Sequence, residues 1–128
     1  MNTLKFVVPG KPRVQQRPIV LRRGWAIDPP ESKAEKKRIA QIAYVEQQRV
    51  RLPILAGDLE VGMSFYGLRP NADISNAIKL VEDALNKVIY LDDKQICKLI
   101  AERFTRFPGE PRTEVEILER LPEQPALL

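Results

Sequence analysis

The apolar residues of this 128-residue chain change their spacing several times, and the order of these changes restricts the folds available to it. Apolar spacing of three and four residues predicts one helix from Ser32 to before Pro53 and a second from Asp73. Alternating or short apolar runs predict strands over residues 3–8, 59–66, 98–104 and 113–118. The expected fold is α+β, a small mixed sheet of about four strands with two main helices in the order β-α-β-α-β-β.

Local signals mark the first helix and three of the strands. Ser32 and Glu35 form the S-x-x-E pattern of a capping box, which predicts the start of the first helix. Gly62 predicts a bulge in the strand over residues 59–66. The turn that contains Pro108 and Gly109 predicts that the last two strands pair as a hairpin. The apolar face of the first helix is expected to comprise Ile39, Ile42, Ala43 and Val50.

The second predicted helix has the most regular pattern in the chain. At about 100° per residue its apolar side chains fall within one arc, and only Leu80 lies among polar residues. The arc comprises Ile74, Ala77, Ile78, Val81, Ala84 and Leu85. The opposite, polar side comprises Asp73, Asn76, Lys79 and Asp83. The helix is therefore expected to pack on the sheet and to present these polar residues to solvent.

The length suits one domain over residues 1–128, in which residues 11–30 form a basic, proline-rich loop and residues 122–128 a frayed tail. Cys97 is the only cysteine, so a disulfide within the chain is impossible and a reducing, cytoplasmic location is expected. No apolar run is long enough for a membrane span, so no membrane partner is expected.

Positive charge is concentrated at the front of the chain. The net charge is +4, but residues 1–27 contain no acid. Their basic residues are Lys5, Lys11, Arg13, Arg17, Arg22 and Arg23. Such a block favours a polyanionic partner such as nucleic acid, although it is also compatible with a solvated loop. Trp25 in this loop could stack on an unpaired base or anchor the loop, whereas Tyr90 is expected in the core.

The chain contains no histidine, which excludes Ser/His/Asp and Cys/His catalysis and histidine-ligated metals. Asp73 and the pair Asp92-Asp93 could instead supply hard oxygen ligands for Mg²⁺ or Mn²⁺, if the loop meets the helix or a second subunit. The alternative is that Asp73 caps the helix and Asp92-Asp93 form a turn. Lys79 could stabilise a scissile phosphate beside such a metal, or pair with Asp83 on the surface.

The combined pattern is specific. Asp73 is followed by Asn76, Lys79 and the run Asp83-Ala84-Leu85, and then by Asp92-Asp93-x-Gln95. Near the front, Gly10-Lys11-Pro12-Arg13 and Asp28-Pro29-Pro30 precede a lysine-rich helix. In these features the chain resembles the RusA family of Holliday junction resolvases.

The resemblance implies a homodimer that binds four-way or other branched DNA and, with Mg²⁺ or Mn²⁺ in its place, resolves Holliday junctions by paired symmetric cleavage in recombination and repair. It implies catalytic roles for Asp73, Lys79 and Asp93. The metal-ligand candidates are Asp73, Asp83, Asp92 and Asp93. The candidates for DNA contact are Lys11, Arg13, Arg17, Arg22, Arg23, Arg69 and Lys79.

One position departs from the family pattern. Where the pattern has a second aspartate, two residues after the first, this chain has Ser75, which is a weaker ligand for a divalent ion. Asp83 or Asp92 could compensate, cleavage could be slow, or the protein could bind branched DNA without cutting it. Two other readings are a PD-(D/E)xK nuclease, which needs Asp92-Asp93-Lys94 on a strand, and an interaction domain that binds no nucleic acid.

Overall fold

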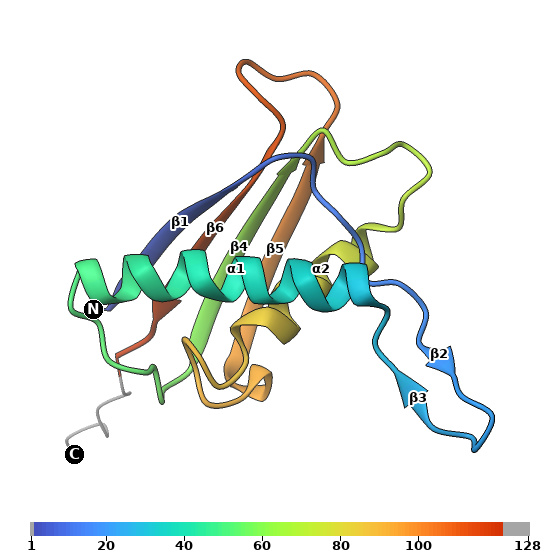
Figure 1. Ribbon diagram of the computed structural model, residues 1–128. Coiled ribbons are helices and arrows are strands. Elements are labelled where there is room, and N and C mark those ends of the chain that lie inside the picture. The colour runs from blue at the N-terminus through green and yellow to red at the C-terminus, as the bar shows by residue number, and fades with distance from the viewer. Residues whose placement is uncertain (1, 122–128) are drawn as a thin grey trace.

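The computed structural model describes residues 2–121, and Figure 1 shows their arrangement. The predicted tail over residues 122–128 lies outside this range. In chain order the elements are β1 (Thr3–Pro9), β2 (Ile19–Val20), β3 (Ala26–Ile27), α1 (Pro30–Arg49), β4 (Leu59–Tyr66), α2 (Ile74–Leu85), the short 3-10 helix η1 (Asp93–Gln95), β5 (Ile96–Phe104) and β6 (Arg112–Glu119). Within residues 2–121 no helix has the length and apolarity needed to cross a membrane.

The four long strands form one mixed sheet in the spatial order β1-β6-β4-β5. β6 runs antiparallel to both neighbours, and β4 and β5 run parallel. Alternate residues of β1 and β4 are buried, and they form a single core with α1 and α2. α1 crosses the face of the sheet in Figure 1. The predicted α+β fold, with its four-stranded mixed sheet and two main helices, is confirmed; the structure adds a small second sheet of β2 and β3.

The predicted hairpin of the last two strands is wrong. β5 and β6 do not pair, because β4 lies between them. The connecting segment crosses the end of β4, where the Tyr66 ring stacks on Phe104 with 4.7 Å between centroids and meets the edge of Phe107 at 5.5 Å. The Arg112 guanidinium lies 4.0 Å from the centroid of the Tyr66 ring. This aromatic cluster stabilises the crossing in place of a tight turn.

The start of α1 also differs from the predicted capping box. The helix begins at Pro30 with Pro29 as its N-cap, and no side chain caps it. Ser32 is buried, and its Oγ accepts a hydrogen bond from the Gln16 backbone amide at 3.0 Å. Proline suits this first turn because its fixed φ is helical and it needs no amide partner. Ser32 therefore holds the preceding loop rather than the helix end.

The buried faces of the helices differ from the predicted arcs at two positions. Val50 follows the end of α1 and is exposed, whereas Gln47 within the helix is buried. Leu80, which the helical projection placed among polar residues, is fully buried in the core. α2 contacts both α1 and strand β5 of the sheet, so its buried stripe is wider than contact with one element would require. The irregularity in β4 lies between Leu59 and Glu60, so the predicted bulge at Gly62 is wrong.

The core position of Leu80 gives a direct stability test. Leu80→Ala is expected to lower the free energy of unfolding by about 2–5 kcal/mol, because the substitution removes buried methyl groups and leaves a cavity. Leu91→Ala, at a leucine that is 55% exposed, is the matched control and is expected to change it by less than about 0.5 kcal/mol. Urea unfolding measures both. Equal effects of the two substitutions would contradict the packing described for α2.

Candidate nucleic-acid interface and acidic site

Asp73 lies at the N-terminal end of α2 and caps the helix. Its Oδ1 accepts a hydrogen bond from the Ser75 amide at 2.9 Å, and its side chain is exposed. Arg103 of β5 fixes the preceding loop by donating to the carbonyl oxygens of Pro70, at 3.1 Å, and Ala72. The N-cap expected for Asp73 is therefore present, and Arg103 sets the position from which its carboxylate projects.

Asp92 and Asp93 lie at the start of η1. Asp92 accepts a hydrogen bond from the Lys94 amide at 2.8 Å, and its own amide donates to the Gln95 side chain at 2.8 Å. Gln95 in turn donates to the carbonyl oxygens of Leu55 and Gly57, at 3.0 and 2.9 Å. The Lys94 amide is the main reason that the pKa of Asp92 is lowered. Because Asp93 and Lys94 lie on η1 and not on a strand, the PD-(D/E)xK arrangement is not met.

The carboxylates near the C-terminal half of α2 repel one another. Burial raises the pKa of Asp93, and the neighbouring Asp92 and Asp83 raise it further. Burial also raises the pKa of Glu82, again with contributions from Asp93 and Asp83. Tyr90 is buried, as expected, and its hydroxyl donates to the Glu82 carbonyl oxygen at 3.0 Å, which holds the chain before Asp92 against α2.

Within one chain, Asp73 lies apart from these carboxylates. Asp73 and Asp83 are ten residues apart along α2, which corresponds to about 15 Å at the helical rise. Asp93 follows Tyr90, whose backbone pairs with Asn86 and whose hydroxyl bonds to the Glu82 carbonyl oxygen, so Asp93 lies toward the other end of the helix. Among residues 2–121, no group of three or more Asp, Glu, Cys or His side chains could hold a metal ion. A single chain thus supplies suitable oxygen donors at two separate places.

Lys36 of α1 connects the basic loop to α2. Its ammonium lies 2.6 Å from the Asp28 carboxylate and 3.7 Å from that of Asp83. The hydrogen bond from Lys36 is the main reason that the pKa of Asp28 is lowered. Asp83 therefore pairs with Lys36, and no ion pair of Lys79 occurs among the described residues. The surface pair with Asp83, one of the two alternatives for Lys79, is not formed.

A cavity of about 270 Å³ lies where the basic loop meets α2. Lys79 and Arg17 both line it, together with Asn76, Asp28, Lys36 and Asp83. The Gln15 amide donates to the Asn76 carbonyl oxygen at 3.0 Å, which fixes the loop against the first turns of α2. The fold thus brings Arg17 and Lys79 to the same cavity, although the two are far apart in sequence.

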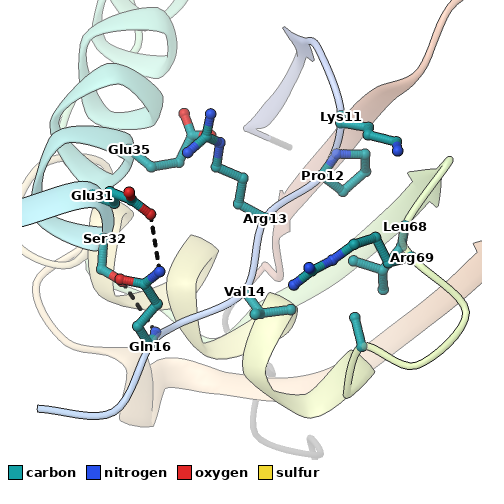
Figure 2. Close-up of a pocket in the computed structure, with 11 residues that line it drawn as sticks. Lys11, Pro12, Arg13, Val14, Gln16, Glu31, Ser32, Glu35, Leu68 and Arg69 are labelled. Carbon is teal, nitrogen blue, oxygen red and sulfur yellow. Dashed lines mark hydrogen bonds and ion pairs between the residues drawn. The ribbon is translucent and has the colours of Figure 1, made fainter. Parts of the chain in front are cut away.

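Three other predicted DNA-contacting residues, Lys11, Arg13 and Arg69, line a second cavity of about 340 Å³. Figure 2 shows this cavity, with Arg13 directed toward Glu35 and Gln16 hydrogen-bonded to Ser32 and Glu31. The Arg13 guanidinium lies 3.4 Å from the Glu35 carboxylate, so part of its charge is balanced. Arg22 and Arg23 lie apart from both cavities, in the turn between β2 and β3.

Sequence reasoning missed two residues that organise the site. Lys36 was one of several lysines and arginines on α1, and nothing local distinguishes it from Lys37. Arg103 lies on β5, 31 residues from the Ala72 carbonyl that it contacts. The only sequence signal near Lys36 in the folded protein was the Asp28-Pro29-Pro30 pattern. Asp28 of this pattern is the residue whose carboxylate pairs with Lys36.

A two-layer α+β fold that presents a basic loop beside exposed lysine and carboxylate side chains suits a small protein that acts on a polyanion. The profile of the family described as Endodeoxyribonuclease RusA matches residues 9–118. The chain is also 33% identical, over 144 aligned positions, to the uncharacterized protein YqaN of Bacillus subtilis strain 168, with 93% of this chain and 98% of the relative covered. The chain belongs to the RusA family, a family of DNA endonucleases that resolve Holliday junctions.

The Lys36 network predicts a pH-dependent contribution to stability. Lys36→Met is expected to lower the free energy of unfolding by about 1 kcal/mol at pH 7. Because the folded-state pKa of Asp28 is below its usual 3.8, this contribution is complete above that value and is lost as the pH falls through the lowered pKa. Urea unfolding at pH 7 and near pH 2 measures the change.

The control for this prediction is Lys37→Met, which alters an exposed neighbouring lysine. Its effect on unfolding is expected to be small at both pH values. A loss in Lys36→Met that is equally large near pH 2 would show that packing of the lysine stem, and not the ion pair with Asp28, is responsible.

Proposed function

We propose that the protein is a metal-dependent endodeoxyribonuclease that resolves four-way DNA junctions by paired symmetric cleavage. The observation that carries this proposal is the position of Lys79 on the exposed side of α2, six residues after Asp73 and in one cavity with Arg17, within a chain that matches the RusA profile over residues 9–118. The protein would act in recombination and repair of DNA, in a reducing, cytoplasmic setting.

Mg²⁺ fits the donor chemistry, and Mn²⁺ is expected to substitute for it. Asp73 and Asp93 offer carboxylate oxygens, which hard divalent ions prefer. Asp92 and Asp83 are the further ligand candidates, although Asp92 caps η1 and Asp83 pairs with Lys36. When bound, the ion would lower the pKa of a water molecule and neutralise charge on the phosphate.

We propose that the ligand set is completed between the two protomers of a homodimer. Asp73 and Asp93 belong to opposite ends of α2, and one chain does not gather three acidic donors within residues 2–121. A two-fold dimer presents every surface twice and can place one end of a helix beside the other end of its copy. Two equivalent sites of this kind would account for paired cuts in a symmetric junction.

The remaining roles belong to cationic side chains. Lys79 would contact the scissile phosphate and stabilise its developing charge, with Arg17 beside it. Lys11, Arg13 and Arg69 would bind phosphates further along the DNA, and Arg22 and Arg23 would bind them at the β2–β3 turn. These contacts would orient the DNA with little readout of base sequence.

The proposal predicts the behaviour of two single variants. Asp73→Asn and Asp93→Asn are each expected to slow cleavage of a synthetic four-way junction by roughly 100-fold or more, because each loses charge that is needed in the transition state. Junction binding in EDTA is expected to remain. Asp58→Asn, at an exposed aspartate outside the candidate site, is the control and is expected to cut at the wild-type rate.

Mixed dimers then test the shared site. A dimer of one Asp73→Asn chain and one Asp93→Asn chain, purified through two different tags, retains one intact pair of Asp73 and Asp93 only if the pair is formed between protomers. Nicking of one strand is therefore expected. A mixed dimer as inactive as its parents would place each site within one chain, and wild-type activity in both single variants would contradict the nuclease mechanism.

Ser75 favours a second candidate function, a protein that binds junctions or other branched DNA without cutting them. Its side chain is exposed in the first turn of α2, where the family pattern has a carboxylate. A hydroxyl carries no charge to attract a divalent ion, so the metal site would be weaker. Wild-type protein that binds junctions but makes no nicks with either Mg²⁺ or Mn²⁺ would support this function.

Restoring the carboxylate tests the same position. Ser75→Asp is expected to lower the Mg²⁺ concentration for half-maximal cleavage by roughly tenfold, because ligand charge raises affinity for hard cations. The fold is expected to tolerate it, since α2 has no acid in its first turn and an acid there is favourable. Gln41→Glu, at an exposed residue of α1 outside the candidate site, adds the same charge and serves as the control. An unchanged Mg²⁺ dependence in Ser75→Asp would exclude residue 75 from the metal site.

A further inference from the structure

The β2–β3 hairpin extends away from the sheet and the helices (Figure 1). Ile19 pairs with Ile27, and Val20 pairs with Ala26. In the turn, the Gly24 amide donates to the Leu21 carbonyl oxygen at 2.8 Å, and Gly24 has a φ of 80°. This is the geometry of a three-residue hairpin loop, in which the third position is left-handed and favours glycine.

The turn fixes the order of side chains at the tip. The Leu21 amide donates to the Trp25 carbonyl oxygen at 2.7 Å, so Trp25 lies directly opposite Leu21. Arg22 and Arg23 occupy the loop between them. Facing residues of an antiparallel pair share one side of the hairpin, as do residues two apart. Trp25 therefore lies on the same side as Leu21, Ile19 and Ile27.

This apolar side of the hairpin is uncovered. Trp25 is 69% exposed and is the only tryptophan of the chain. Leu21, Ile19 and Ile27 are exposed as well. A two-stranded hairpin that packs on nothing is of marginal stability in water, and exposed aromatic and aliphatic side chains gain free energy when a partner covers them. The structure therefore contains an apolar surface that lacks a covering layer within residues 2–121.

The surrounding charge indicates the chemistry of the partner. Residues 1–27 contain no acid, and Arg17, Arg22 and Arg23 form no ion pair among the described residues. Arginines beside an exposed aromatic ring suit a strand that offers phosphates and unstacked bases. Apolar side chains also insert between base steps where stacking is interrupted. Continuous duplex DNA offers the phosphates but not the exposed base faces.

We infer that the β2–β3 hairpin recognises the branch point of DNA. Trp25 packs on a base face that the branch exposes, and Arg22 and Arg23 bind the flanking phosphates. This inference rests on the proposed action on junctions and adds to it the element that distinguishes a branch from a duplex. It assigns no role in bond cleavage to the hairpin.

Intrinsic fluorescence tests the contact, because all tryptophan emission comes from Trp25. In EDTA, a four-way junction is expected to quench this emission, and a duplex of one arm's sequence is expected to quench it much less at equal occupancy. Trp25→Ala is expected to weaken junction binding roughly tenfold and to leave duplex binding unchanged. Trp25→Phe is expected to restore most of the loss, and Tyr44→Ala, at an exposed aromatic on α1, is the matched control.

Other outcomes of these experiments would overturn either this inference or the proposed function. Two results would overturn the inference without contradicting the proposed cleavage of junctions. The first is tryptophan emission that is not quenched when a junction is bound, and the second is an equal loss of junction and duplex binding in Trp25→Ala. Dissociation of dimers in Trp25→Ala, measured by sedimentation, would overturn it in favour of a second copy of the chain as the covering partner. Wild-type protein that neither prefers nor cuts junctions would instead overturn the proposed function.

Discussion

Docking of the basic loop against α2 is the interaction on which the candidate site depends. Lys36 reaches the carboxylates of Asp28 and Asp83, and the Gln15 amide bonds to the Asn76 carbonyl oxygen. A loop this rich in proline and arginine has little tendency to order itself, because its proline residues donate no backbone hydrogen bond and its charges repel. Contacts with α1 and α2 supply the order and place Arg17 in the cavity that Lys79 also lines.

α2 determines how far one chain can complete a metal site. Its buried stripe holds the helix against α1 and the sheet, so its two ends lie at separate parts of the surface. Asp73 caps one end, and Tyr90 holds the segment before Asp92 and Asp93 against the other. The carboxylates cannot approach one another by a side-chain rotation, because about 15 Å of helix separates the ends. The homodimer proposed above would bring these unlike ends together through its two-fold symmetry.

Most of the secondary structure could be predicted from the sequence because its signals are local. The alternating pattern of β4 arises because one face of the strand is buried, and the amphipathic pattern of α2 arises because one side of the helix contacts the core. The N-cap at Asp73 and the buried position of Tyr90 follow from equally local signals. The resemblance to the RusA family was also visible in short motifs, and the profile match over residues 9–118 confirms it.

What the sequence did not reveal depends on contacts between distant residues. Pairing β5 with β6 was reasonable for neighbouring strands, but an aromatic cluster around Tyr66 favours a connection that crosses β4. Ser32 matched a helix-cap pattern, but Pro29 and Pro30 already form the start of the helix. The Ser32 hydroxyl instead accepts a hydrogen bond from the Gln16 backbone amide. Leu80 broke the predicted arc because α2 is covered from two sides. In each case a side chain contacts a segment that is distant in sequence, and a local pattern cannot show such a contact. The same holds for Lys36 and Arg103 at the candidate site.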